Sequence, residues 1–234
     1  MKTYKKECGY SYALGAFPTF ELIKNRPDKA RAVFYHERLS ADAGVGELFD
    51  MARKNNIPLE CDSRLCEKLS QKENTFVVGV FDKYSSELER GANHIMLVNP
   101  SDMGNLGTVM RTALGFGFCD IAVVGEHADF FNPKTIRSSM GSFFSLRVQE
   151  FDNFERYAAA HGNMCFPFML GAKAGLGQIS RPNGPFTLVF GNESSGLPSF
   201  FESVGTPVKI EHSGKIDSLN LPVAAALAMF WFYR

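Results

Sequence analysis

Apolar and polar positions follow two different patterns along this chain, and the change falls near residue 85. Before that point, helical periodicity marks 17–24 and 45–55, and runs rich in Val and Phe predict strands at 32–36 and 75–81. The two kinds of element are mixed without regular order. This part of the chain therefore predicts a small α/β domain.

The rest of the chain alternates strands and helices regularly. Strands are predicted at 94–98, 120–124, 165–170, 186–190 and 206–210, and helices at 107–116, 133–139, 151–161 and 221–232. This alternation predicts a parallel sheet with crossover helices on both of its faces. Ligands of such sheets bind at the carboxyl ends of the strands, so the loops that follow the strands are the places to look for chemistry.

A polar run at 83–92 separates the two patterns and predicts a domain boundary. We therefore expect a small α/β domain at 1–85 and a second domain at 92–234. The longest apolar stretch, 221–233, is shorter than the roughly 20 residues needed to span a bilayer. The N-terminus has no long apolar core, so no signal peptide is predicted. These observations predict a cytoplasmic protein that does not enter a membrane.

Composition narrows the candidate functions only slightly. Lys plus Arg and Asp plus Glu both number 25, so any site for nucleic acid must be a local patch on a neutral protein. The five cysteines form no CxxC pair, which predicts free thiols. The five histidines show no spacing typical of ligands, so we expect no metal.

The first candidate loop follows the strand at 94–98 and reads Asn99-Pro-Ser-Asp-Met-Gly-Asn-Leu-Gly. Asn105 is the predicted N-cap of a helix that begins near Leu106, because its side chain can accept a hydrogen bond from a free helix N–H. Arg111 follows six residues later. The segment by itself is equally compatible with a capped helix that carries one solvated arginine.

Two more loops have a similar character. The strand at 186–190 runs into Gly191-Asn192-Glu193-Ser-Ser-Gly196, whose glycines would allow the backbone to approach a ligand, although ordinary turn chemistry fits as well. The third loop, Asp217-Ser218-Leu219-Asn220, precedes a long apolar helix. It is either a simple cap or a place where exposed helix N–H groups hold a polar ligand.

Taken together and in this order, the three loops resemble the motifs of the SpoU/TrmH family of SPOUT RNA methyltransferases. The chain reads NPSDMGNLGTVMRTALGFG, LVFGNESSGLP and DSLNLPVAAALA where that family reads N-x5-N-L-G-x3-R-T-A, L-x-x-G-N-E-x-x-G-L and D-S-L-N-x-x-x-A-A-A. The segment 136–146 is similar to the family's linker between the first two motifs. The detailed resemblance covers 93–234, and 1–82 is similar in pattern to the RNA-binding domain that often precedes the catalytic one.

The resemblance implies an α/β fold with a deep C-terminal trefoil knot and S-adenosylmethionine as cofactor. The implied cofactor contacts are Leu170, Gly171, Gly191, Asn192, Gly196, Ile210, Ser218, Leu219 and Asn220. The implied reaction is methylation of a ribose 2′-hydroxyl. For this reaction the family assigns the leading role to the arginine of the first motif, here Arg111. Because a guanidinium resists deprotonation, we interpret Arg111 as a group that binds phosphate or stabilises a developing alkoxide. Asn105, Glu193, Ser218 and Asn220 would position it and the ribose.

The chain departs from the family before the third motif, where it reads Ile210-Glu211-His212 in place of Ile-Pro-Met. An acidic Glu211 beside the cofactor loop is expected to alter how the cofactor sits. The family works as homodimers. The apolar run 223–233 covers every face of its predicted helix, so we expect it to be buried nearly all round in a dimer interface. A core helix in a monomer is the alternative.

The sequence leaves the substrate open between ribosomal and transfer RNA, and the extra N-terminal domain favours ribosomal RNA. A catalytically silent RNA-binding or assembly factor on the same fold is the competing hypothesis, although the chain retains Asn105, Arg111 and Glu193. A dinucleotide-binding enzyme is disfavoured, because no G-x-G-x-x-G follows an early strand.

Overall fold

The computed structural model describes residues 3–40, 43–69 and 75–233, and contacts divide the chain into two compact units. The first unit holds residues up to Tyr84 together with Asp129–Ser145, and the second holds Ser85–Ala128 and Leu146–Arg234. The boundaries 1–85 and 92–234 given above stay a prediction. The contacts group the segment Asp129–Ser145 with the first part of the chain, a feature that no local pattern indicated.

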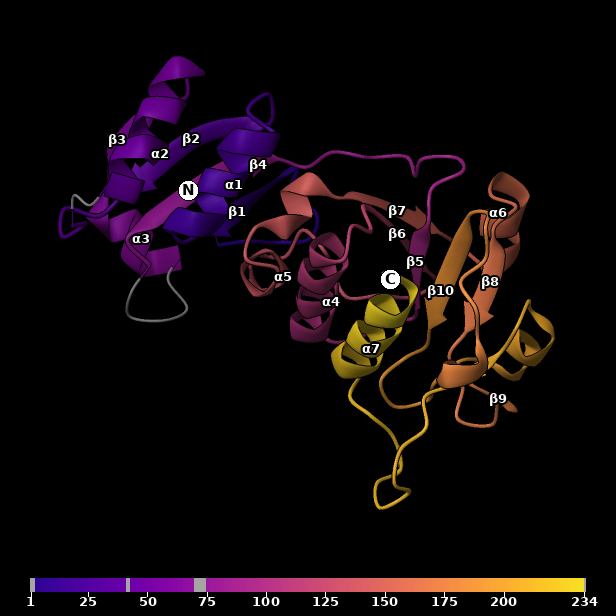
Figure 1. Ribbon diagram of the computed structural model, residues 1–234. Helices are drawn as coiled ribbons and strands as arrows, with labels where there is room; N and C mark the ends of the chain where they lie inside the picture. Colours follow the sequence, from indigo (N-terminus) through magenta and orange to yellow (C-terminus); the bar gives the residue numbers. More distant parts are fainter. Residues whose placement is uncertain (1–2, 41–42, 70–74, 234) are drawn as a thin grey trace. The chain divides into compact units, whose positions relative to one another are not determined.

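The first unit is built on a four-stranded mixed sheet in the order β1-β4-β2-β3 (Figure 1). β4 is antiparallel to both β1 and β2, and β2 is parallel to β3. Its elements are β1 (Tyr10–Leu14), α1 (Ala16–Asn25), β2 (Ala30–Tyr35), α2 (Ala43–Lys54), β3 (Leu59–Cys61), α3 (Ser63–Leu69), β4 (Val77–Asp82), α5 (Pro133–Ser138) and η1 (Ser142–Ser145). The predicted α/β character is confirmed, whereas β1, β3 and α3 were not foreseen.

The second unit is built on a five-stranded sheet in the order β7-β6-β5-β10-β8, and every neighbouring pair is parallel. Its elements are β5 (His94–Val98), α4 (Met103–Gly115), β6 (Asp120–Val124), β7 (Arg147–Phe151), α6 (Phe154–Ala160), β8 (Met164–Pro167), β9 (Ala174–Gly175), η2 (Leu176–Gln178), β10 (Phe186–Phe190), η3 (Ser199–Ser203), β11 (Val208–Lys209) and α7 (Leu221–Tyr233). Parallel strands buried on both faces read as continuous apolar runs, and β5, β6 and β10 do so.

Helices cover both faces of this sheet, as predicted. On one face Tyr157 of α6 packs with Met96 and Val189 of the strands. On the other, Phe232 of α7 lies 5.0 Å from Phe186 between ring centroids. Figure 1 shows α4 and α7 side by side, and the two helices are in contact. The two helices whose N-terminal ends carry the first and third motifs are therefore packed together.

Several element boundaries differ from the prediction. The strand predicted at 165–170 is β8 and ends at Pro167, and the strand predicted at 206–210 is only β11, which pairs with β9 outside the five-stranded sheet. α4 begins at Met103 rather than near Leu106, because the carboxylate of Asp102 accepts a hydrogen bond from the Asn105 N–H at 2.8 Å and so acts as the N-cap. The predicted N-cap role of Asn105 is therefore wrong. The predicted helix at 151–161 begins only at Phe154, because 147–151 pairs with β6 as the unforeseen strand β7.

The C-terminal helix α7 is buried along one side only. Ala225, Ala228 and Met229 are fully buried. The opposite side exposes large apolar residues at Val223, Leu227, Phe230, Trp231 and Tyr233. The expectation that this helix is buried nearly all round is therefore not met within one chain. Within the described residues, no helix is long and apolar enough to cross a membrane.

Candidate functional site

Two loops of the site leave the sheet from neighbouring strand ends. β5 and β10 are adjacent and parallel, so the residues after Val98 and after Phe190 start at the same edge. The side-chain amide of Asn192 ties the two loops together, because its Nδ2 donates a hydrogen bond to the carbonyl oxygen of Asn99 at 2.8 Å. The topology thus brings the first and second motifs into contact, as the loop positions predicted.

Glu193 binds the start of α4 through both carboxylate oxygens. Oε2 accepts hydrogen bonds from the Ser101 N–H at 3.1 Å and the Ser101 hydroxyl at 2.9 Å. Oε1 accepts from the Asp102 N–H and from Asn105 Nδ2, each at 3.2 Å. A carboxylate near a helix N-terminus is also stabilised by the helix dipole. Asn105 and Glu193, both predicted as site residues, are therefore directly bonded.

The hydrogen bonds also keep Glu193 ionised. Burial by itself raises its pKa, but hydrogen bonds from its own backbone amide, from the Ser101 amide and from the Asn105 and Ser101 side chains outweigh that effect. The net pKa of Glu193 lies below its ordinary value. A charged acceptor at this position makes each of its hydrogen bonds stronger than a neutral one. The loop and the helix start are consequently held in one arrangement.

The loop around Glu193 is closed on itself. Asn192 and Gly196 exchange two backbone hydrogen bonds, at 3.1 and 2.9 Å, and Asn192 Oδ1 accepts from the Ser194 and Ser195 amides. Gly196 has a φ of +68°, a region that favours glycine. A Cβ on Gly191 would lie 2.2 Å from the carbonyl carbon of Gly196. Both glycines are thus required by the turn itself, in addition to any role toward a ligand.

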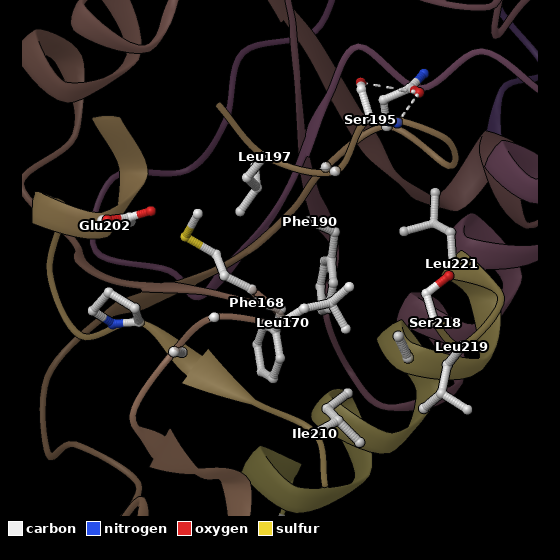
Figure 2. A pocket seen from close by; sticks show the side chains of 18 of the residues that line it. Phe168, Leu170, Phe190, Ser195, Leu197, Glu202, Ile210, Ser218, Leu219 and Leu221 are labelled. Atoms are coloured by element: carbon white, nitrogen blue, oxygen red, sulfur yellow. Dashed lines mark hydrogen bonds between the residues drawn. The ribbon is translucent and has the colours of Figure 1, made fainter. Parts of the chain in front are cut away.

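A cavity of about 860 Å³ opens beside these loops (Figure 2). The residues predicted to contact a cofactor that line it are Leu170, Gly171, Gly191, Asn192, Gly196, Ile210, Ser218 and Leu219. Figure 2 shows the side chains of Leu170, Ile210 and Leu219 around it, and the rings of Phe168 and Phe190 stack at 4.8 Å. Its size is typical of a pocket for a ligand of nucleoside size or larger.

The third motif joins the cavity through part of its length. Ser218 and Leu219 line the cavity, while Asn220 is exposed and is absent from its lining. The carbonyl oxygen of Asn220 accepts a hydrogen bond from the Ala224 N–H at 3.0 Å, so α7 starts directly after it. The exposed loop 213–218 precedes this helix start. Ser218 therefore lies where the cavity meets solvent.

Arg111 lies on the exposed side of α4, while Leu106, Val109 and Met110 on the same helix are fully buried. It is absent from the cavity lining, and within the described parts of the chain no group pairs with its guanidinium. A charged group that makes no bond inside its own chain has its five donors free for an external anion. Glu193 still affects the position of Arg111, because it binds the loop and first turn of the helix that carries it.

Several cavity residues were not foreseen from the sequence. They belong to the segments around β9, η3 and β11, and they are Lys173, Glu202, Thr206 and His212. None of them belongs to a spaced motif, because each reaches the cavity through a loop of its own. The substitution Glu211-His212 for Pro-Met was the one signal that the sequence offered, although Glu211 itself is absent from the lining.

A parallel sheet whose carboxyl-end loops enclose a ligand-sized cavity is typical of an α/β protein that binds a small molecule or cofactor. The family model of the SpoU rRNA methylases matches residues 92–230. The chain belongs to this family, and the family predicted from the three motifs is confirmed. With the family comes its class of enzyme, the S-adenosylmethionine-dependent RNA 2′-O-ribose methyltransferases.

Individual relatives agree with this assignment. The chain is 33% identical over 144 residues to a 23S rRNA guanosine 2′-O-methyltransferase of Bacillus subtilis, and the matched segment covers 59% of the chain and 57% of that relative. It is 27% identical over 215 residues to a 23S rRNA uridine 2′-O-methyltransferase of Streptomyces viridochromogenes, which covers 86% and 74%. The chain thus spans little more than half the length of the first of these relatives.

Solved structures extend the likeness to both units. The AdoMet-bound rRNA methyltransferase from Sinorhizobium meliloti superposes with a TM-score of 0.79 at 26% identity, over 96% of this chain and 87% of that one. Another structure of an rRNA methyltransferase from the same organism gives a TM-score of 0.81 at 26% identity, over 97% of this chain and 87% of that one. The fold of the first unit is therefore shared as well.

Proposed function

We propose that this protein transfers the methyl group of S-adenosylmethionine to a ribose 2′-hydroxyl of ribosomal RNA. The observation that carries the proposal is the convergence of the motifs: Glu193 holds the helix of Arg111, and its own loop and Ser218 line one cavity. Relatives that act on 23S rRNA support ribosomal RNA as the substrate. Transfer RNA is the alternative within the same class.

The cavity residues fit the cofactor. Leu170, Ile210 and Leu219 offer apolar contacts to a flat purine. The amides of Asn192 and of 194–196 are already bonded inside their loop, so backbone carbonyl groups of the loop 191–196 would offer the polar contacts to the charged end. S-adenosylmethionine, when bound, supplies a methyl group on a positively charged sulfur. The cofactor contacts inferred from the motifs, including Asn220 at the helix start, remain part of this proposal.

The protein's own residues would position and activate the ribose. Arg111 is charged at every physiological pH, so it stabilises negative charge on the ribose oxygen or holds a neighbouring phosphate, and it does not remove the proton. Asn105 and Glu193 fix the helix that carries Arg111. Ser218 and Asn220 lie at the other side of the site and would orient the ribose. Positioning of this kind is the main contribution of a protein to a reaction whose reactive carbon belongs to the cofactor.

The chain would act in the cytoplasm as a homodimer through α7. The exposed apolar side of this helix, Val223, Leu227, Phe230, Trp231 and Tyr233, is the surface that supports this proposal. Leu227→Glu should convert the dimer to a monomer in sedimentation experiments. Met164→Glu, at an apolar residue that is 51% exposed on β8, is the control and should leave the mass unchanged. The deep trefoil knot implied by the family resemblance also belongs to the proposal.

The proposed reaction is tested by mapping ribose methylation across total RNA from cells with and without the protein. We expect one position of ribosomal RNA to lose its 2′-O-methyl group in the cells that lack it, and purified protein with S-adenosylmethionine to restore it. Cofactor binding without methylation of any RNA would instead identify a silent RNA-binding factor. Loss of methylation only in transfer RNA would correct the substrate.

A further inference from the structure

One wall of the cavity contains a buried nitrogen that is not bonded. His212 lines the cavity, and its Nε2 is shielded from solvent without a hydrogen-bond partner in the described parts of the chain. His161 Nδ1 is in the same condition, but His161 is absent from the lining. Buried polar groups of native proteins are almost always paired, so an unpaired one in a cavity wall indicates a partner that comes from outside the chain.

The other nitrogen of the ring determines what kind of partner is needed. Nδ1 of His212 accepts a hydrogen bond from the Gly214 N–H at 3.4 Å, across a turn in which Gly214 has a φ of +71°. A ring whose Nδ1 accepts carries its hydrogen on Nε2 when it is neutral. The unpaired atom is therefore a donor, and the missing partner is an acceptor.

The surroundings of His212 favour the adenosine part of the cofactor as the source of that acceptor. Ile210, two residues earlier, lines the cavity with the apolar side chains of Leu170 and Leu219 (Figure 2). Such a wall suits a flat, uncharged purine better than the charged amino-acid end of S-adenosylmethionine. The neighbouring carboxylate of Glu211 is used elsewhere, because it packs against Gly175, where a Cβ would lie 2.9 Å from its Cδ.

We propose that His212 binds the adenosine part of the cofactor and that its Nε2 donates a hydrogen bond to a purine nitrogen or a ribose oxygen. The inference rests on the cofactor cavity proposed above and adds a specific contact to it. A histidine is then a cofactor-binding residue at the position where the family motif has methionine. His212 contributes to affinity and orientation, with no part in removing the proton of the ribose hydroxyl.

Two ligands separate the ends of the cofactor. S-adenosylhomocysteine contains both the adenosine and the amino-acid part, whereas 5′-methylthioadenosine lacks the amino-acid part. Calorimetry should give a dissociation constant for each with the wild-type protein, with His212→Phe and with His212→Gln. Phenylalanine keeps a flat ring without a donor, and the amide of glutamine keeps an N–H near the place of Nε2.

We expect His212→Phe to weaken both ligands by about tenfold and His212→Gln to weaken both by less than about threefold. His161→Gln is the matched control, because it replaces an equally unpartnered buried ring nitrogen outside the cavity, and it should leave both dissociation constants unchanged. Nitrogen-15 spectra of the wild-type imidazoles add a direct readout. The nitrogen-15 chemical shift of His212 Nε2 should change when either ligand binds.

Unchanged affinity in His212→Phe, or an Nε2 chemical shift that stays the same when either ligand binds, would overturn the inference. Weaker binding of S-adenosylhomocysteine with unchanged binding of methylthioadenosine would also overturn it, since the acceptor would then be on the amino-acid part. Failure of the wild-type protein to bind either ligand would instead refute the proposed cofactor cavity. The melting temperature without ligand shows whether each variant is folded.

Discussion

The parallel sheet has one polar cluster where its strands begin, which we call the amino edge, and another where they end, the carboxyl edge. The two clusters differ in how completely their polar groups are hydrogen-bonded. At the amino edge Thr187, His94, Asp120 and Arg147 lie in one row across four paired strands. Both ring nitrogens of His94 are bonded, to Tyr157 Oη and to a backbone carbonyl, each at 2.9 Å. Asp120, 1% exposed, accepts from Arg147 Nε and Nη2 at 2.6 Å each.

At the carboxyl edge only some of the polar side chains are hydrogen-bonded within the chain. Glu193 is saturated by bonds to the loop and helix that it holds. No hydrogen bond among the residues that the structure describes engages the side chains of Arg111 and Ser218, and a cavity opens between the loops. Both edges use charged and hydroxyl side chains. A cluster that satisfies itself stabilises the fold, whereas one that leaves oriented groups unpaired can bind a ligand, because only the second gains bonds on binding.

The largest effect on methyl transfer is expected from Arg111→Ala. The variant removes a free guanidinium from the carboxyl edge, so methyl transfer should fall by at least about 10²–10³-fold. Cofactor affinity should stay within about twofold, because Arg111 is absent from the cavity lining. Single-turnover transfer and calorimetry measure the two quantities.

Arg156→Ala is the matched control for Arg111→Ala, since it removes the same charge from an exposed position on α6. It should leave transfer within a few-fold of wild type. Arg111→Lys keeps the charge without the planar fork and should recover only part of the activity. If Arg111→Ala were to keep its methyl-transfer activity, the role proposed for Arg111 in the reaction would be wrong.

The amino edge should respond in the opposite way. In the wild-type protein the hydrogen bond to Asp120 raises the pKa of the Arg147 guanidinium. Asp120→Ala leaves Arg147 without this main partner. The pair is partly buried and Arg147 keeps Glu89 as a second partner, so removing Asp120 should lower the free energy of unfolding by about 1–2 kcal/mol, measured in urea. Cofactor affinity under native conditions should not change. The exposed pair Arg31–Asp82 is the control, and Arg31→Ala should cost less than about 1 kcal/mol.

The same comparison explains how much of the molecule the sequence could predict. The strands at 94–98, 120–124 and 186–190 match the structure residue for residue, because each is a short, nearly continuous apolar run with a single polar residue at or near its start, as is typical of a buried parallel strand. The three loops of the carboxyl edge were found because each carries a motif in consecutive residues. Features formed by consecutive residues can therefore be predicted from the sequence.

What depends on distant partners was not readable. The strand β7 (Arg147–Phe151) is mostly half-buried and has three polar residues among its five, as is typical of an outer strand of a sheet, so it carries no strong strand signal. Asp102 and Asn105 are both good caps by residue type, and only the position of Glu193 assigns the Asn105 side chain to a different bond. The amino-edge row joins single residues from four strands, and no spacing in the sequence announces such a row.

A smaller effect is expected from Glu193→Gln, which tests how the carboxyl edge is held. The amide that replaces one oxygen faces donors rather than acceptors, so transfer should fall by about tenfold, equivalent to about 1.4 kcal/mol. Because the folded pKa of Glu193 is below its ordinary value, its contribution to stability is complete above about pH 4.3 and is lost as the pH falls through the folded pKa.

Unfolding measured between pH 3 and 6 checks this linkage. The wild-type protein should lose more stability than Glu193→Gln over that range, and equal losses would show that the carboxylate is not held as its hydrogen bonds indicate. Glu202→Gln is the control, because Glu202 lines the same cavity without bonds to α4. It should keep the pH dependence of the wild type.

The smallest effect is expected from His94 of the amino edge and from His161, whose ring packs against it outside the row. Burial lowers the pKa of both His94 and His161, and the proximity of the two rings, 4.8 Å between centroids, lowers that of His161 further. The unfolded chain therefore takes up protons first, at an ordinary histidine pKa of about 6.5. Stability should be complete above that pH and fall below it, until the folded pKa values are reached.

His161→Gln removes one of the two titrating rings without touching the bonded nitrogens of His94. We expect the loss of stability between about pH 6.5 and 5 to become smaller by at most about 1 kcal/mol in this variant, measured as the urea midpoint at each pH. His127→Gln is the comparison, because His127 lies outside the pair of rings formed by His94 and His161, and it should keep the wild-type slope. A wild-type protein equally stable at pH 7.5 and pH 5 would show that the amino edge is open to water, and its contrast with the carboxyl edge would then rest on Asp120 and Arg147 alone.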